Sequence, residues 1–404
     1  MRKQTLLFTL LATILLTVVV SYSKIVSLVQ VISLFDEDKI VENFRSMNRF
    51  SSSSELIPSS NPYVYPSGPK LPLPDVFEHR GNRHSVQDFL SNSWTTGFMV
   101  LQDGYVLRED YFLGNQRSTQ NISWSMAKSF ISALIGIAVN EKAIESVSDP
   151  VDRYAPMLKG SGYEGVSIKD VLQMSSGVGF NEDYGDFYSD INRWGRGFAL
   201  GASQDEFATT LQRERSPGTL SQYVSIDTHV LGMVLTRSTQ TSITEYMQEK
   251  LYEPLGMNHA GYWLVDGEGM EMALGGLNLT LVDFVKIGSL FLNKGKFNGQ
   301  TIVPESWVES SLAGDEEHLA PTESFGYGYQ WWLMPGEDRE FMAMGVYGQY
   351  VYVNPRTRTV IAKLSANPFY NYDYLVSSDY AHLSLFRAIS AAAVKTGLPV
   401  ADSD

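Results

Sequence analysis

Two residues at the head of an apolar run have the types and the spacing of an activated nucleophile. Ser125 and Lys128 stand just before the run from 130 to 139, which is too long for an ordinary strand and predicts a helix reaching about Glu141. Residues three apart on a helix share one face, with Cβ atoms about 5–6 Å from each other. A lysine whose charge is disfavoured by burial can take the proton of a serine hydroxyl. The same four-residue pattern, Ser-x-x-Lys, is common on solvated helix surfaces. Whether it marks a catalytic site therefore depends on other features of the chain.

A tyrosine ahead of another apolar helix is a candidate proton carrier. Tyr223 lies in the loop before a helix predicted over 225–241. A phenol has a pKa of about 10 in water and can act as an acid or base where a neighbouring ammonium lowers that pKa. Lys128 is the candidate neighbour. Taken singly, Tyr223 is also compatible with a place in the hydrophobic core.

A glycine-flanked strand entry is a candidate oxyanion site. Gly345, Val346 and Gly348 lead into a predicted C-terminal strand, where an exposed backbone N–H can point into a cleft. The amide of Ser125, at a helix start, is the second candidate donor. Taken alone, the glycines are more typical of turns.

Composition excludes several other kinds of chemistry. The chain has 404 residues, a formal net charge of −14 and scattered lysines and arginines, so no nucleic-acid surface is expected. It has no cysteine, which excludes disulfides, thiolate metal sites and cysteine catalysis. The six histidines show no metal-ligand spacing, and neither a metal nor a cofactor is predicted.

The N-terminus is predicted to be a targeting segment. A basic start at 1–3 precedes an apolar stretch at 5–20, and a second apolar run covers 25–35. The segment is either a cleaved signal peptide or an uncleaved transmembrane helix with its positive end inside. Both place the remainder outside the cytoplasm, in the periplasm, and we favour the anchor at the inner membrane.

The remaining chain divides into a linker and a folded domain. Residues 36–84 are predicted to be a short helix followed by a Pro/Ser-rich linker or surface strap, and residues 85–404 the folded domain. Strands are predicted at both ends of that domain with helices between them, and a long loop at 180–201. This order predicts an α+β fold with one antiparallel sheet flanked by helices. The predicted hairpins are 97–101 with 105–113 and 341–353 with 359–364, and the predicted helices are 167–174 (N-cap Ser167), 225–241, 243–251, 281–292 and 380–394.

The order of these motifs resembles the serine β-lactamase and penicillin-binding superfamily. Ser125-x-x-Lys128, then Tyr223-x-Ser225, then a glycine-rich strand entry follow that pattern. Within it the chain is most similar to class C-like hydrolases, above all the 6-aminohexanoate-dimer hydrolases (nylon-oligomer hydrolases). The stretches that carry this similarity are 180–184, 222–231, 307–314, 330–332, 348–349 and 354–365.

The resemblance implies a fold and a role for each matching residue. It implies an antiparallel sheet sandwiched by helices, with an all-helical subdomain and the site between them. Ser125 would be the nucleophile, Lys128 its base and Tyr223 the proton shuttle, with the oxyanion held by the amides of Ser125 and Val346. The implied substrate-binding residues are Tyr184, Ser225, Gly345 and Tyr347.

Departures from the family pattern narrow the expected substrate. The usual cation two residues before the third-motif glycine is replaced by Ala343, which disfavours β-lactams and D-alanyl peptides. Leu274 stands where the nylon-oligomer enzymes have a substrate-contacting asparagine, and Tyr347 replaces a histidine of some relatives, as in some carboxylesterases. The sequence therefore predicts a serine hydrolase of a small ester or linear amide. The alternatives are a penicillin-binding enzyme or β-lactamase, and a non-catalytic anchored binding module; the oligomeric state stays open.

Overall fold

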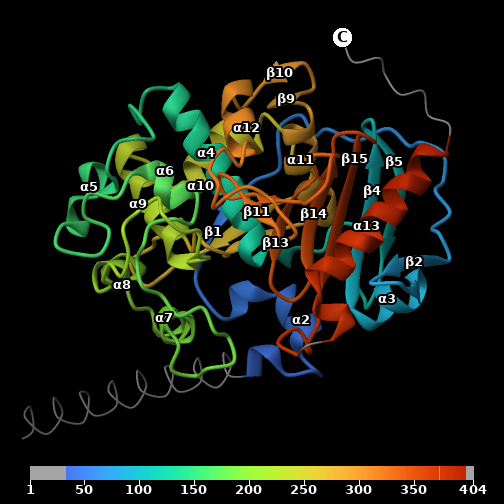
Figure 1. Ribbon diagram of the computed structural model, residues 1–404, viewed down its shortest axis with the longest axis horizontal. Coiled ribbons are helices and arrows are strands. Elements are labelled where there is room, and N and C mark those ends of the chain that lie inside the picture. Colours follow the sequence, from blue (N-terminus) through green and yellow to red (C-terminus); the bar gives the residue numbers. More distant parts are fainter. Residues whose placement is uncertain (1–32, 373, 397–404) are drawn as a thin grey trace, which may run out of the picture.

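An antiparallel sheet of seven strands forms the centre of the computed structural model, which describes residues 33–372 and 374–396 (Figure 1). Its order, β11-β12-β13-β14-β15-β4-β5, brings the two ends of the folded domain together. Both predicted hairpins are confirmed in this sheet. The strands are β4 (Thr95–Gln102), β5 (Tyr105–Tyr111), β11 (Gly326–Tyr327), β12 (Trp332–Leu333), β13 (Phe341–Gly345), β14 (Gln349–Asn354) and β15 (Thr359–Ser365).

Helices cover both faces of this sheet. The helix α11 (Leu281–Leu292) packs on β14 and β15, and α13 (Asp379–Val394) packs with α3 (Val86–Asn92) on the opposite face. Strands covered on both faces read as continuous apolar runs, and every residue of β4, β14 and β15 is buried. The approach is close at Gly288, where an added Cβ would lie 2.7 Å from a methyl of Val351. The short hairpin β2 (Val76–His79) with β3 (Asn82–Ser85) packs beside α13.

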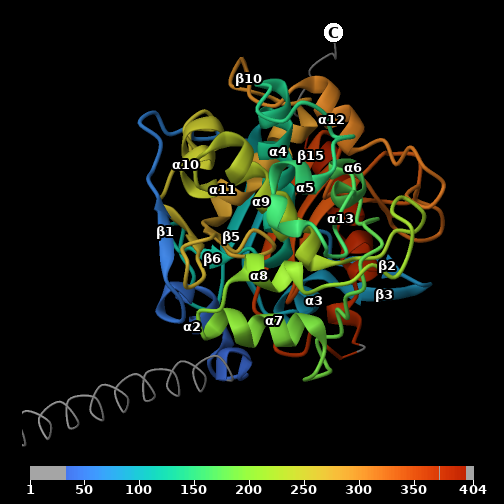
Figure 2. The same ribbon diagram turned by 90° about the vertical axis from the view of Figure 1, so that its left-hand side faces the viewer.

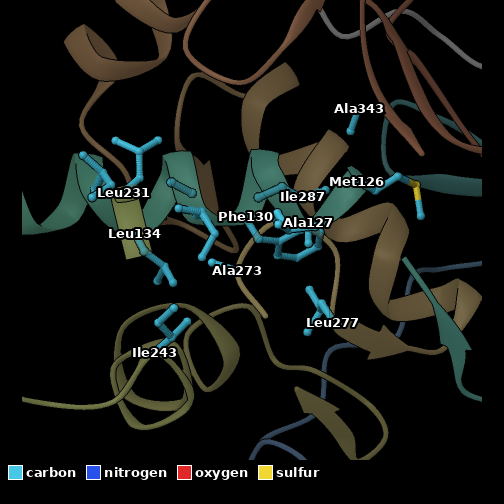
Figure 3. Close-up of a cluster of buried hydrophobic side chains, with 14 of the residues drawn as sticks. Met126, Ala127, Phe130, Leu134, Leu231, Ile243, Ala273, Leu277, Ile287 and Ala343 are labelled. Carbon is cyan, nitrogen blue, oxygen red and sulfur yellow. The ribbon is translucent and has the colours of Figure 1, made fainter. Parts of the chain in front are cut away.

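A helical region stands beside the sheet and surrounds the helix that follows Ser125. This helix, α4 (Ala127–Asn140), is buried along nearly its whole length. Figure 3 shows Phe130 and Leu134 of α4 among side chains from α9, α10, α11 and β13. The predicted helices are confirmed, including the cap at Ser167, whose hydroxyl accepts from the Asp170 amide at 3.0 Å. The helices of this region are α5 (Val151–Tyr154), α6 (Ile168–Leu172), α8 (Gln204–Thr209), α9 (Ser225–Thr239) and α10 (Ile243–Met247), and α12 (Glu305–Ser311) lies nearby.

A second sheet joins the N-terminal part of the chain to the region around Ser125. Its order is β1-β7-β8-β6, and β1 pairs with β7 in antiparallel register. The strands are β1 (Ser53–Leu56), β6 (Asn121–Ile122), β7 (Gly261–Leu264) and β8 (Leu277–Leu279), and a separate small hairpin pairs β9 (Lys296–Phe297) with β10 (Gln300–Thr301).

The stretch 36–84, predicted to be a short helix followed by a linker or surface strap, is packed against the rest of the chain. The expected short helix exists as α2 (Ile40–Phe44), and residues 53–56 form β1. The proline-rich part runs as a strap, with the Gly68 and Leu71 amides bonded to carbonyls of β5 at 2.8 and 2.9 Å. Composition signalled an extended chain correctly but did not show that buried side chains tie it to the core. We call residues 33–51 the N-terminal arm.

Two further predictions need correction. The stretch 180–201 is not a loop throughout, because it contains α7 (Asp190–Ala199), whose N-terminus is capped by the hydroxyl of Ser189. The predicted strand 341–353 is interrupted by a turn in which Tyr347 and Gly348 have φ angles of 64° and 88°. That turn lies at the candidate oxyanion site, so the interruption concerns function as well as fold.

The predicted membrane segment, 1–35, falls almost wholly outside the described residues. Within 33–372 and 374–396, no helix is both long and apolar enough to cross a bilayer.

Candidate active site

Ser125 lies at the junction between the helical region and the sheet. It occupies the middle of a 3-10 turn, Trp124–Met126, that leads directly into α4. The preceding residue Ser123 is fixed to β8, since its amide donates to the Leu277 carbonyl at 2.8 Å. Trp124 has a left-handed φ of 45°, an uncommon conformation for a bulky residue. The side chain of Ser125 lines a pocket, as a nucleophile must.

Lys128 is buried behind Ser125, on the first turn of α4. Its side chain is 1% exposed, and its Nζ donates to the Leu274 carbonyl at 2.8 Å and to the Ser225 Oγ at 3.3 Å. Burial lowers the pKa of Lys128 to about 7, although the carboxylates of Glu182 and Asp227 act in the opposite direction. An amine with such a pKa is substantially neutral near pH 7 and can accept a proton.

Tyr223 lies in the loop before α9, as predicted, and beside both partners. The Lys128 Nζ is 5.4 Å from the centre of its ring. Burial raises the pKa of Tyr223 well above its usual value, while hydrogen bonding with the Ser125 and Ser225 hydroxyls lowers it in part. Its ring stacks on Trp332 at a centroid distance of 5.4 Å. The serine, the lysine and the tyrosine predicted from the sequence therefore come together.

Glu182 is a site residue to which the sequence analysis assigned no role. Its carboxylate accepts from the Ser225 hydroxyl at 2.5 Å, the Ser225 amide at 3.0 Å and the Tyr184 hydroxyl at 2.9 Å. It thus fixes two predicted substrate-binding residues, Ser225 and Tyr184, at once. The available signal was a carboxylate two positions before Tyr184 in the matching stretch 180–184.

The end of β13 lies directly against the nucleophile turn. A Cβ built on Gly345 would come within 2.4 Å of the Ser123 carbonyl oxygen and 3.1 Å of the Ser125 amide nitrogen. Only a glycine permits this approach. Val346 and Tyr347, which follow, line the same pocket as Ser125. The predicted oxyanion and substrate-binding residues of this strand are therefore at the site.

No group of three or more histidine, cysteine or acidic side chains with the arrangement of a metal site occurs in the described part of the chain.

Comparison with known proteins agrees with this geometry. A family model described as Beta-lactamase matches residues 95–382. The 6-aminohexanoate-dimer hydrolase of Paenarthrobacter ureafaciens is 31% identical over 297 residues, which cover 70% of this chain and 75% of that protein.

Solved structures share the fold. A candidate 6-aminohexanoate-dimer hydrolase from Bacillus anthracis superposes with a TM-score of 0.79 at 24% identity, covering 91% of this chain and 97% of that one. A family VIII carboxylesterase gives a TM-score of 0.55 at 16% identity over 76% of this chain and 96% of that one. The predicted α+β fold of the β-lactamase and penicillin-binding type is confirmed. The chain belongs to the beta-lactamase family of serine hydrolases.

Proposed function

We propose that the protein cleaves a small ester or linear amide through an acyl-enzyme intermediate. The observation that carries this proposal is the position of the Lys128 amine, buried with a pKa lowered to about 7 and next to the Tyr223 ring. A neutral amine beside a phenol that lies next to the Ser125 hydroxyl is the arrangement that a serine nucleophile needs. The relationship to an amide hydrolase and the shared fold with a carboxylesterase support both bond types.

In the acylation step, the Ser125 Oγ attacks the substrate carbonyl. Its proton passes to Lys128 with the help of Tyr223, and the amides of Ser125 and Val346 hold the negative charge on the carbonyl oxygen. Collapse of the tetrahedral intermediate breaks the ester or amide bond, and the alcohol or amine leaves with the proton from the Tyr223–Lys128 pair. Water then attacks the acyl-serine by the same route, releasing the acid and restoring the Ser125 hydroxyl.

A fluorophosphonate probe tests the identity of the nucleophile. We expect the wild-type chain to be labelled and Ser125→Ala to lose both labelling and ester turnover. Ser132→Ala is the matched control, because Ser132 is a buried serine of α4 whose hydroxyl has no partner among the described residues. Undiminished labelling of Ser125→Ala would refute the proposal.

Fluorescent penicillin distinguishes the penicillin-binding alternative. Ala343 offers no cation for a β-lactam carboxylate, so we expect turnover of p-nitrophenyl esters or linear amides without stable acylation by penicillin. Stable penicillin labelling of Ser125 would favour the alternative.

We further propose that the domain acts outside the cytoplasm, in the periplasm, tethered by residues 1–35 at the inner membrane if they are not cleaved. The basic start and apolar runs of that segment support this placement. Activity of a C-terminal alkaline phosphatase fusion, which requires export, would support it; an inactive phosphatase fusion alongside a fluorescent cytoplasmic fusion would contradict it.

A further inference from the structure

The pocket that opens beside Ser125 is large and mostly apolar. It encloses about 480 Å³, within the usual size of small-molecule sites. Arg196 is the one charged side chain among the described residues that line it. Its guanidinium is already engaged, since it lies 3.9 Å from the centre of the Phe187 ring and donates to the Phe187 carbonyl at 2.6 Å. The pocket thus offers a ligand apolar surface much more than charge.

Two segments whose structure the sequence analysis did not predict, the N-terminal arm and α7, contribute to this lining. The N-terminal arm contributes four apolar residues, and α7 contributes an apolar stripe with Gly195. Both segments lie at the same end of the molecule (Figure 1, Figure 2). The lining residues from these two segments include Phe35, Met47, Phe50, Ile191, Trp194 and Gly195.

Aromatic contacts fasten the arm to the residues on either side of the reacting serine. Phe35 stacks on Tyr347 with ring centroids 5.0 Å apart. Phe44, which is buried, meets the Trp124 ring at 5.5 Å and the Tyr347 ring at 5.2 Å. Trp124 directly precedes Ser125, and Tyr347 directly follows Val346. The arm is therefore positioned against the site and is part of its wall.

We infer that this pocket binds an apolar, linear acyl group of medium length, and that the N-terminal arm determines this specificity. The inference rests on the proposed function and names its substrate class. A chain extending from the carbonyl at Ser125 would pass between the arm and α7 and transfer its methylenes from water to apolar surface. Each buried methylene is expected to raise kcat/KM by roughly fourfold until the pocket is full.

Alkyl fluorophosphonates measure this preference independently of the leaving group and of deacylation. The Ser125 Oγ forms a bond to phosphorus, fluoride leaves, and the serine proton is released through the Tyr223–Lys128 pair. We expect the second-order labelling rate of the full-length protein to rise from ethyl to octyl probes, and p-nitrophenyl acetate, butyrate, hexanoate and octanoate to follow the same order. All probes are used below the concentrations at which they form micelles.

Gly195 provides a variant that fills the pocket. A Cβ at this position meets no heavy atom within 4 Å, so a larger side chain has room. We expect Gly195→Phe to lower the ratio of the octyl to the ethyl labelling rate by at least about tenfold. Gly195→Ala is the control for the change in helix backbone and should keep the wild-type order.

Phe35 tests the arm itself. Phe35→Ala should reduce the octyl-to-ethyl ratio by at least about fivefold. Phe112→Ala is the matched control, because Phe112 is 40% exposed, against 38% for Phe35, and lies outside the pocket lining. A flat or falling chain-length series, or an unchanged ratio in both Gly195→Phe and Phe35→Ala, would overturn the inference while leaving Ser125 as the nucleophile. Retained labelling in Ser125→Ala would instead overturn the proposed function.

Discussion

Within residues 33–372 and 374–396, a lysine is buried beside a tyrosine ring and a serine hydroxyl in two places, and only one of these faces the pocket. Lys128 lies 5.4 Å from the Tyr223 ring centre and 3.3 Å from the Ser225 Oγ. On the face of β15 that is covered by α13, Lys363 lies 5.9 Å from the Tyr350 ring centre and 2.5 Å from the Ser365 Oγ.

Burial lowers the pKa of both lysines to about 7. The two clusters therefore have the same residue types and, in each, burial is the main cause of the lowered amine pKa.

Access and geometry distinguish the two clusters. The pocket lining includes Ser125, which lies beside Tyr223, whereas Lys363 and its neighbours do not line the pocket. The Tyr350 hydroxyl is instead engaged with Asp379 at 2.6 Å. A perturbed pKa marks a candidate base, but a reacting hydroxyl and an open path to it are required as well.

The largest expected effect is on turnover in the paired lysine variants. Lys128→Met should lower kcat/KM for p-nitrophenyl esters by at least about a hundredfold, because the proposed general base is lost. Lys363→Met is the matched control and should stay within about threefold of wild type. Steady-state kinetics on both proteins, with circular dichroism to establish folding, measure the difference.

If kcat/KM falls equally in folded Lys128→Met and folded Lys363→Met, the proposed difference in function between the two clusters is wrong. The same follows if Lys128→Met keeps full activity.

The second expected effect is on stability, where the two lysines should behave alike. Each amine is neutral above about pH 7 in the folded chain but holds its proton up to about pH 10.5 when unfolded. The unfolded chain therefore binds more protons between these values, and the free energy of unfolding rises with pH across that window. Replacing either lysine by methionine should stabilise the protein by ~1–4 kcal/mol near pH 7 and flatten this rise.

Urea denaturation at pH 7 and at pH 9.5 measures the change. If Lys363→Met lowers the free energy of unfolding at both pH values, the hydrogen bond from the amine to Ser365 stabilises the fold by more than burial of the amine destabilises it.

Much of the central fold was predictable because its signals are local. The hairpin β4–β5, the helix α11 and the helix α13 follow from runs of apolar residues with turn or capping residues beside them. The N-terminal arm was not predictable in the same way. Its charged and short apolar stretches resemble a solvated linker, and only long-range contacts such as Phe44 with Trp124 hold it in place. The helix α7 was hidden by its glycines, which lower helix propensity.

The candidate site also has a part that the sequence predicts and a part that it does not. The residues Ser125, Lys128 and Tyr223 could be predicted from their motifs, and the structure brings them together. The pocket could not, because its walls come from segments far apart in the sequence. Glu182 was missed for a related reason: its partner Ser225 is 43 residues away, and no spacing rule joins them.

The smallest expected effect sharpens the comparison at the catalytic cluster and concerns Glu182. Its carboxylate raises the pKa of Lys128 against the larger, opposite effect of burial. Glu182→Gln removes that charge, so the Lys128 pKa should fall further and the amine should stay neutral to lower pH. Since the neutral amine is the proposed base, the acidic limb of the kcat/KM profile should move to lower pH by up to about one unit. Asp183→Asn is the control, because Asp183 is adjacent in sequence but is not among the charges that act on Lys128.

If the acidic limb of the Glu182→Gln profile stays in place or moves to higher pH, the group whose titration controls kcat/KM is not Lys128. Lys363 differs from Lys128 in this respect: burial alone lowers the pKa of its amine, and no carboxylate raises it.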